Sequence, residues 1–169
     1  MNETPNDLAR LQALLTRSIE RAGEHLKRTF EMPEHSLDAV QLVRYIGQEQ
    51  QYALATVTAR GEPRVAPVQV VLQRGHFFVP TAADAVRTGH VARRPSVSMT
   101  HWVSNEVALI THGRAVVIGH SDAEFDELSE AYVRDWWQEL RRRRNGAFLR
   151  VEPDALYTWA RDPSAFPRD

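Results

Sequence analysis

The feature that most constrains the fold is a series of short segments that are rich in β-branched residues and joined by tight turns. Residues 52–58, 65–72 and 76–79 are such segments. Gly61 supplies the positive φ that the first turn requires, and Arg74 and Gly75 form the second turn. Because so few residues separate the segments, we expect them to pair as antiparallel strands.

The rest of the chain shows further strand and helix patterns around these segments. Strands are expected at residues 97–103, 107–119 and 147–159, the last of them bent at Pro153. Helices are expected at residues 8–26, from Ser36 to Gly47, at residues 83–93, and from a capping box at Ser121 and Glu124 to Gly146. Because strands dominate and pair locally, we predict an α+β fold, mainly β, around a small antiparallel barrel. We divide the chain into an N-terminal helical extension, residues 1–35, and a barrel domain, residues 36–169.

Composition narrows the possible chemistry. The 169 residues include no cysteine, which excludes disulfides, thiolate nucleophiles and cysteine-ligated metal centres. The net charge of -1 gives no sign of nucleic-acid binding, and no stretch is long and apolar enough to cross a bilayer. The polar, acidic N-terminus is unlike a secretory signal, so we expect a cytoplasmic protein. Any redox chemistry must come from a bound cofactor.

One part of the strand-rich region has the residues of a phosphate-binding site. Pro67 cannot donate to a strand ladder, so its strand is at an edge, bulged or close to a ligand. Thr81 ends a strand just before a predicted helix, and Arg87 lies about one turn into that helix. A hydroxyl, free helix amides and a guanidinium that converge could hold a phosphate. The same residues fit a simpler interpretation, in which Thr81 only caps the helix and Arg87 faces solvent.

The order and spacing of these residues resemble the pyridoxamine 5′-phosphate oxidase-like family of FMN-binding split β-barrels. The run from Tyr52 to Pro63 resembles the first hairpin of that family, and Thr81, Arg87 and Pro95 follow at the family's spacings. The resemblance covers residues 37–159. It implies a split antiparallel barrel that forms a homodimer with cofactor sites at the subunit interface, and it implies that Thr81 and Arg87 hold the cofactor phosphate. The residues that would line the flavin ring, partly through backbone groups, are Ala66, Pro67, Val68 and Gln69.

The sequence departs from the true oxidases of this family at two points. Those oxidases have an arginine in the second strand where Ala66 stands here, and a C-terminal Arg-Leu-His-type motif that residues 148–169 lack. Oxidation of pyridoxamine phosphate is therefore not expected. The departures resemble an actinobacterial branch whose members bind FMN or the deazaflavin coenzyme F-420. The deazaflavin-dependent members of that branch are reductases that transfer hydride to unsaturated substrates.

Aromatic residues and histidines leave further possibilities open. Trp102 and Trp159 are candidates for walls of the cofactor or substrate pocket, or for core or dimer packing. Trp136 and Trp137 are adjacent and cannot share one helix face, so we expect one in the core and the other at an interface. The histidines show no metal-ligand spacing, and we expect no metal site. A histidine-ligated haem stays as an alternative, because some relatives of this fold bind haem.

The leading hypothesis is an oxidoreductase that binds FMN, or coenzyme F-420, at a homodimer interface and transfers hydride to a small organic substrate. The alternative is a flavin or haem carrier without turnover. A third possibility is a barrel that has lost its ligand and acts through its surface. The sequence does not identify a proton donor.

Overall fold

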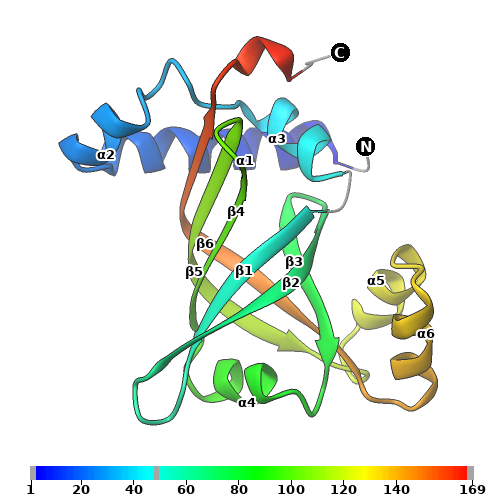
Figure 1. The fold of residues 1–169 in the computed structure, drawn as a ribbon. Helices are drawn as coiled ribbons and strands as arrows, with labels where there is room; N and C mark the ends of the chain where they lie inside the picture. The colour runs from blue at the N-terminus through cyan, green and yellow to red at the C-terminus, as the bar shows by residue number, and fades with distance from the viewer. Residues whose placement is uncertain (1–2, 48–49, 167–169) are drawn as a thin grey trace.

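The computed structural model describes residues 3–47 and 50–166. The strands are β1 (Gln50–Val57), β2 (Pro63–Gln73), β3 (His76–Ala82), β4 (Ser96–Val103), β5 (Val107–Ile118) and β6 (Gly146–Ala160). The helices are α1 (Pro5–Arg21), α2 (Glu24–Thr29), α3 (Ala39–Ile46), α4 (Val86–Arg93), α5 (Phe125–Ala131) and α6 (Asp135–Arg142), with a short 3-10 turn, η1 (Pro163–Ala165), after β6. The strands form the centre of the molecule and the helices surround them (Figure 1).

The strands close into an antiparallel barrel in the order β1-β2-β3-β6-β5-β4, with β4 paired back to β1. The β2–β3 ladder joins residues 71–73 to residues 76–78, so the N-terminal half of β2 pairs with β1 alone. This short ladder splits the barrel, and Pro67 lies on the open edge, where a missing N–H is tolerated. The predicted split antiparallel barrel with peripheral helices and an N-terminal helix is confirmed.

Alternate residues of the strands point into the barrel and form its core. Phe77 and Val79 of β3 pack there with Val70 of β2, and all three are almost fully buried. Leu11 and Leu15 of α1 belong to the same cluster. The N-terminal helix therefore shares one continuous hydrophobic core with the barrel.

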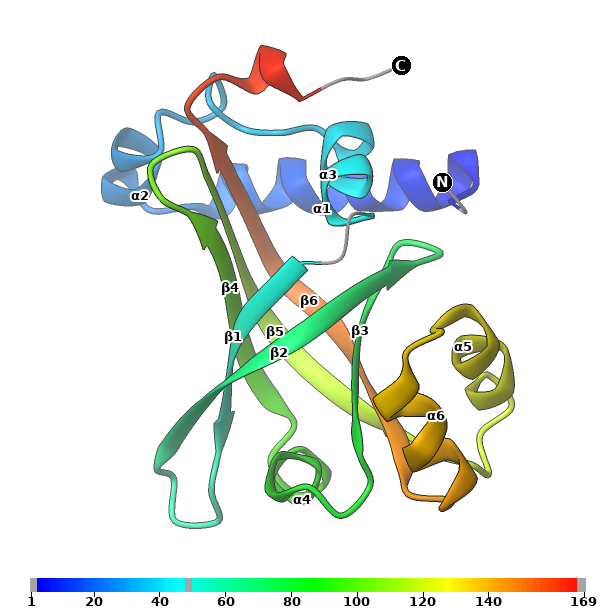
Figure 2. The ribbon, with the colours of Figure 1, turned by 45° about the vertical axis from the view of Figure 1, so that its right-hand side comes forward.

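Helices cover both ends of the barrel and one side. α1 and α3 lie across one end, which we call the α1 end, and α4 lies at the opposite end, which we call the α4 end (Figures 1 and 2). α5 and α6 pack on the outside of the barrel, where Phe125, Trp137 and Phe148 belong to a second apolar cluster. None of the helices in the described residues is long and apolar enough to span a membrane.

The first two predicted helices have different limits in the structure. α1 ends at Arg21, and the segment around Leu26 forms the separate helix α2 instead of continuing the first. The prediction that Ser36 caps the next helix, α3, is wrong. Asp38 is the cap, because its carboxylate accepts the backbone N–H of Gln41 at 2.9 Å and the Gln41 side chain accepts the N–H of Asp38 at 3.0 Å.

The predicted capping box at Ser121 and Glu124 was also wrong. Asp122 occupies this turn instead, and its carboxylate accepts the backbone N–H of Gly119 at 2.7 Å. α5 begins at Phe125 without a side-chain cap. An aspartate therefore caps α3, whereas α5 has no side-chain cap.

The helix predicted to run on to Gly146 is broken into α5 and α6. Tyr132 has an extended backbone, with φ -104° and ψ 91°, and α6 starts at Asp135. In one continuous helix Tyr132 and Trp137 would point about 140° apart, because each residue turns the helix by about 100°. The break lets both rings enter the second apolar cluster, and it leaves Trp136 partly exposed. Trp137 is therefore the core tryptophan that the pattern predicted.

β6 bends at Pro153, as predicted. Gly113 of β5 pairs with Pro153, and Asp154 has no partner in the β5–β6 register, which is the arrangement of a β-bulge. A Cβ atom at Gly113 would lie 2.2 Å from the carbonyl oxygen of Glu152. Glycine is required here because the two backbones approach too closely for a side chain.

Candidate functional site

Two clefts adjoin the N-terminal half of β2. The first, the α4 cleft, lies between the β1–β2 hairpin and α4 and has a volume of about 540 Å³. Its lining residues are Leu54, Thr56, Thr58, Arg64, Val65, Ala66, Ala85, Val86, Arg87 and His90. The second, the Trp102 cleft, also has a volume of about 540 Å³, and its lining residues are Gln51, Tyr52, Ala53, Val65, Ala66, Pro67, His101 and Trp102. Val65 and Ala66 line both clefts, so the two form one extended concave surface.

Among the described residues, the α4 cleft is lined by basic side chains and by no acidic one. Arg64 reaches it from β2, and Arg87 and His90 reach it from α4. His90 is held by a hydrogen bond between its Nδ1 and the buried Thr56 hydroxyl, at 3.0 Å. Arg64 contacts Glu62 at 2.8 Å, an exposed pair that water screens. The cleft therefore attracts an anion.

The first turn of α4 adds to this positive field. Its N-cap is Ala85, which offers no side-chain acceptor to the first amides. Every other α-helix in residues 3–47 and 50–166 has an acidic residue in its first turn or a side-chain cap. α4 has neither, and Arg87 places a further positive charge at the positive end of the helix dipole. A bound anion would satisfy both the amides and the guanidinium.

Thr81 lies apart from this arrangement. It is 3% exposed, and its hydroxyl has no hydrogen-bond partner among the described residues. Thr81 shares one face of β3 with Phe77 and Val79, whose side chains point into the barrel. It does not line the α4 cleft. The interpretation that Thr81 caps α4 is wrong, because Ala85 is the cap. The structure therefore places Arg87 and Ala66 in the same cleft, whereas Thr81 is buried and does not line it.

The Trp102 cleft has a different character, because none of the described residues that line it is Asp, Glu, Lys or Arg. Its rim is apolar: Trp102 is 59% exposed, Val65 is 68% exposed, and Pro67 is exposed between them. Ala53 contributes a small side chain from β1. Such a surface suits a flat, uncharged ring.

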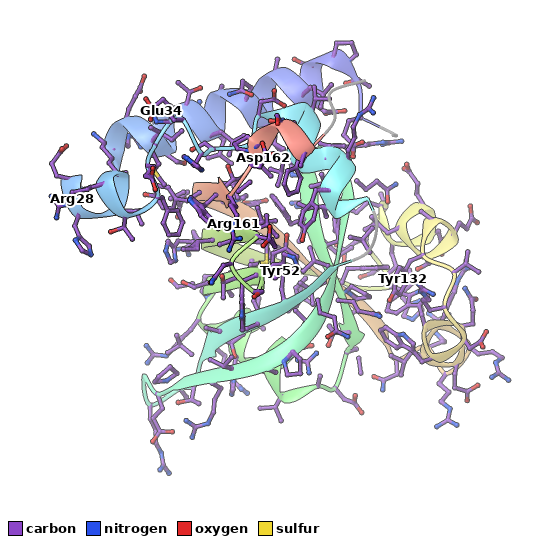
Figure 3. All side chains as sticks on the ribbon, turned by 45° about the horizontal axis from the view of Figure 1, so that its top comes forward. Arg28, Glu34, Tyr52, Tyr132, Arg161 and Asp162 are labelled. Atoms are coloured by element: carbon purple, nitrogen blue, oxygen red, sulfur yellow. The ribbon has the colours of Figure 1, made fainter. Side chains whose placement is uncertain are left out.

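Two buried polar rings also line the Trp102 cleft. The Nδ1 of His101 lies 2.8 Å from the carbonyl oxygen of Gln51, and its Nε2 lies 2.7 Å from the hydroxyl of Tyr45. Because a carbonyl only accepts, Nδ1 carries a proton and donates it to Gln51, while Nε2 pairs with the Tyr45 hydroxyl. Tyr52, labelled in Figure 3, packs 5.3 Å from His101 between ring centroids. Burial, and secondly the neighbouring Tyr45, raise the pKa of Tyr52, so its hydroxyl stays protonated.

The remaining predicted site residues lie outside both clefts. Val68 is buried in the barrel core, so only its backbone could touch a ligand. Gln69 is half-buried, and its side-chain oxygen accepts the hydroxyl proton of Tyr132. Trp159 stacks on His35, with ring centroids 6.3 Å apart and planes inclined by 15°. In the described residues no three His, Asp or Glu side chains gather in a way that could hold a metal ion.

Among the lining residues of the α4 cleft that sequence reasoning missed, the basic ones are Arg64 and His90. Arg64 precedes Ala66 by two positions on one strand, so strand alternation places both on the same face. His90 follows Arg87 by three positions on α4, which also places them on one face. Both relations were present in the sequence, but they gain meaning only once the hairpin and α4 are known to face each other.

The structure is thus a split barrel in which an uncapped basic helix lies beside an apolar cleft. The chain belongs to the pyridoxamine 5′-phosphate oxidase family, whose sequence model matches residues 40–160. The predicted family is thereby confirmed. No curated protein matches the sequence significantly.

Solved structures share the fold at low sequence identity. The conserved hypothetical protein Rv2991 from Mycobacterium tuberculosis is 13% identical, with a TM-score of 0.62 over 80% of this chain and 92% of that one. HutZ, the haem storage protein from Vibrio cholerae, is 17% identical, with a TM-score of 0.60 over 70% of this chain and 92% of that one. A pyridoxamine 5′-phosphate oxidase-related, FMN-binding protein from Nostoc punctiforme is 12% identical, with a TM-score of 0.55 over 69% and 76%. At these identities the likeness establishes the fold alone.

Proposed function

We propose that this protein is an oxidoreductase that binds FMN, or the deazaflavin coenzyme F-420, and transfers hydride to a small organic substrate. The observation that carries the proposal is the α4 cleft, where two arginines and an uncapped helix start converge with no acidic side chain among the lining residues. Family membership supports a flavin-type cofactor, since the matched family is that of an FMN-dependent oxidase.

The residues present fit both parts of such a cofactor. Arg87, Arg64 and the first amides of α4 would hold the phosphate, with charge-assisted hydrogen bonds from the guanidinium groups. The ring would lie against Ala66 and Pro67 and extend into the Trp102 cleft, because the two clefts are continuous at Ala66. The open edge of β2 leaves its backbone groups accessible to the polar edge of the ring.

A second copy of the chain would complete the site. The Trp102 cleft is open, and the exposed side chains of Val65 and Trp102 give it an apolar rim. In a two-fold dimer the same surface is used twice, which gives two equivalent cofactor sites. The absence of cysteine is consistent with the cytoplasm as the compartment.

In this proposal the protein binds, orients and shields, and the bound ring supplies the hydride chemistry. Arg87 and Arg64 fix the phosphate end, so that the ring has one position along β2. Trp102 and Val65 exclude water from one side of the ring. Both nitrogens of His101 are engaged, and solvent can supply any proton that the product requires.

The alternative is a carrier of flavin or haem without turnover. The engagement of both His101 nitrogens favours it, because His101 is the only histidine among the described residues that line the Trp102 cleft. The haem storage protein HutZ shares the fold. An absorption band near 450 nm would indicate FMN, one near 420 nm the deazaflavin, and a Soret band haem.

The test is an equilibrium titration of the protein with FMN and with coenzyme F-420, followed by fluorescence. Arg87→Ala should weaken binding by about 1.5–3 kcal/mol, or roughly 10- to 150-fold, because it removes a charge-assisted hydrogen bond. Arg93→Ala is the matched control: Arg93 lies on the same helix, is exposed and does not line the cleft.

Each result has a clear consequence. Loss of affinity in the Arg87 variant alone supports the site. Equal affinity in wild type and the Arg87 variant would place the anion elsewhere. Binding of neither cofactor by the wild-type protein would refute the proposed function, and oxidation of the reduced cofactor by a panel of quinones and unsaturated ketones separates the enzyme from the carrier.

A further inference from the structure

His90 is the basic residue of the α4 cleft to which the proposed function gives no role. It lies three positions after Arg87 on α4, so the two side chains share one face of the helix, and both line the cleft. Side chains of a helix lean toward its N-terminus, so the His90 ring covers the turn that carries Arg87. The ring is therefore close to the guanidinium that would hold an anion.

Thr56 of β1 fixes one side of this ring. Its hydroxyl lies 3.0 Å from Nδ1 of His90, and the Thr56 residue is 3% exposed. Among residues 3–47 and 50–166, each of these two side chains is the one hydrogen-bond partner of the other. The buried hydroxyl proton of Thr56 thus has a single acceptor within its reach.

This contact decides which nitrogen of the neutral His90 ring carries the proton. If Nδ1 carried it, the Thr56 hydroxyl would accept that proton, and its own proton would be buried without a partner, which is costly. If Thr56 donates to Nδ1 instead, no buried proton is left unpaired. The second arrangement is therefore the more stable, and it places the ring proton on Nε2.

Nε2 is the free donor of His90. It has no hydrogen-bond partner in the described part of the chain, and it is not one of the buried polar atoms that lack a partner, so a ligand in the cleft can reach it. A protonated ring would donate from the same nitrogen. His90 therefore offers an N–H to the cleft in both of its protonation states.

Thr56 also places His90 beside Arg64. Thr56 and Arg64 are partners in the β1–β2 register, so their side chains lie on the same face of the hairpin, with Cβ atoms about 4.5–5.5 Å apart. Arg64 lines the α4 cleft from this face, and α4 lies next to the hairpin (Figure 2). Three side-chain donors, on Arg64, Arg87 and His90, thus reach one cleft.

We propose that His90 is a third ligand of the anion in the α4 cleft, with Thr56 as its positioning residue, and that this anion is a phosphate monoester. A monoester has three unesterified oxygens, one for each of Arg64, Arg87 and His90, whereas a diester has two. The inference rests on the proposed function, and it selects FMN, whose phosphate is a monoester, over coenzyme F-420, whose phosphate is a diester.

The first test needs no cofactor. NMR correlations between ring protons and ring nitrogens, assigned with His90→Asn and recorded in alkaline buffer, show which nitrogen of His90 carries the proton. We expect Nε2 in the wild type. We expect a mixture of both tautomers in Thr56→Val, which keeps the shape of the side chain but removes the hydroxyl. A proton on Nδ1 of the wild type would overturn the inference, whatever ligand the protein binds.

The second test is a titration with FMN and with riboflavin, which lacks the phosphate. His90→Asn keeps a polar group for Thr56 but has no atom at the position of Nε2. It should weaken FMN binding about 10- to 150-fold, the value of a hydrogen bond to a charged group, and leave riboflavin binding unchanged. His90→Gln has an amide nitrogen that reaches this position and should recover most of the loss. Thr56→Val should weaken FMN binding about two- to tenfold, and should add nothing in the His90→Asn background.

His112→Asn is the matched control. Nδ1 of His112 also meets a hydroxyl, that of Ser98 at 2.8 Å, but His112 lines neither cleft, so this variant should bind FMN like wild type.

Three results would count against the inference. Equal losses of FMN and riboflavin affinity in His90→Asn, or wild-type affinity for FMN in that variant, would remove His90 from the site and leave the proposed function intact. An equal loss of affinity for FMN and for coenzyme F-420 in the same variant would overturn the assignment of a monoester. If wild type binds neither cofactor, the proposed function fails and this inference fails with it.

Discussion

The bend of β6 offers a sharp test of the fold, through Gly113→Ala. The added Cβ would lie 2.2 Å from the Glu152 carbonyl oxygen, while ordinary contact begins at 3.4 Å, so the overlap is 3.4 − 2.2 = 1.2 Å. The obstructing atoms are backbone atoms of the paired strand, including the Cα of Pro153 at 2.9 Å, so no side chain can turn away. Relief requires β5 and β6 to separate locally by about 1 Å, which lengthens neighbouring ladder bonds beyond hydrogen-bond range.

The expected cost combines two effects. Overpacking of this kind costs about 1–3 kcal/mol, and the weakened ladder bonds add roughly 0.5–1.5 kcal/mol. The free energy of unfolding should therefore fall by about 2–4 kcal/mol, and the melting temperature by roughly 4–16 °C for a chain of this size.

Urea unfolding followed by circular dichroism measures this loss. Gly89→Ala is the control, because a Cβ there meets only the end of the Arg93 side chain at 3.7 Å. Its position inside α4 means that alanine should stabilise by up to about 1 kcal/mol. If Gly113→Ala unfolds within about 0.5 kcal/mol of wild type, the close approach of β5 and β6 is not a feature of the protein.

Two further predictions concern stability. Trp137→Ala should lower the free energy of unfolding by about 3–5 kcal/mol, because the Trp137 ring is fully buried. Trp136→Ala should lower it by less than half as much, because the Trp136 ring is half-exposed. Equal losses in the two variants would refute the break between α5 and α6. Burial, and secondly the charges of Arg10 and Arg150, lower the pKa of His76 from its ordinary 6.5, although Glu124 and Glu152 act the other way. Above pH 6.5 the His76 ring is mostly neutral in both the folded and the unfolded chain. As the pH falls below this value the unfolded chain takes up the proton first, so the free energy of unfolding decreases as the pH decreases. His76→Gln should therefore lose less stability than wild type between about pH 7.5 and about pH 5.5 in urea unfolding, and parallel losses would contradict the assignment.

The sequence predicted the barrel well because its strands are specified locally. The β-branched runs and the glycines at positions 61 and 75 identify the first hairpins, and both glycines have positive φ in the structure. Helix limits were less predictable, since they depend on contacts made elsewhere in the fold. The break after α5 follows from packing that brings Tyr132 and Trp137 into one cluster, which no local pattern encodes.

The site was predictable only in part, for a related reason. Arg87 was identified from its spacing, and it does line a basic cleft. Arg64 and His90 became visible only when the register of β1 and β2 and the position of α4 were known. The Gln69 contact with Tyr132 joins residues 63 positions apart and has no local signature. Long-range side-chain contacts of this kind are what a single sequence leaves undetermined.

The open edge of β2 explains the fold and the candidate site together. The ladder to β3 begins at Val71, so residues 63–70 have β1 as a partner on one side and no strand on the other. If the ladder continued, β3 would cover the edge on which Val65 and Pro67 now lie exposed, and the two clefts would lose their common wall. A proline within β2 opposes that continuation, because it removes a donor that further pairing would need. The short β2–β3 ladder that splits the barrel therefore also leaves the backbone of residues 63–70 uncovered on one side.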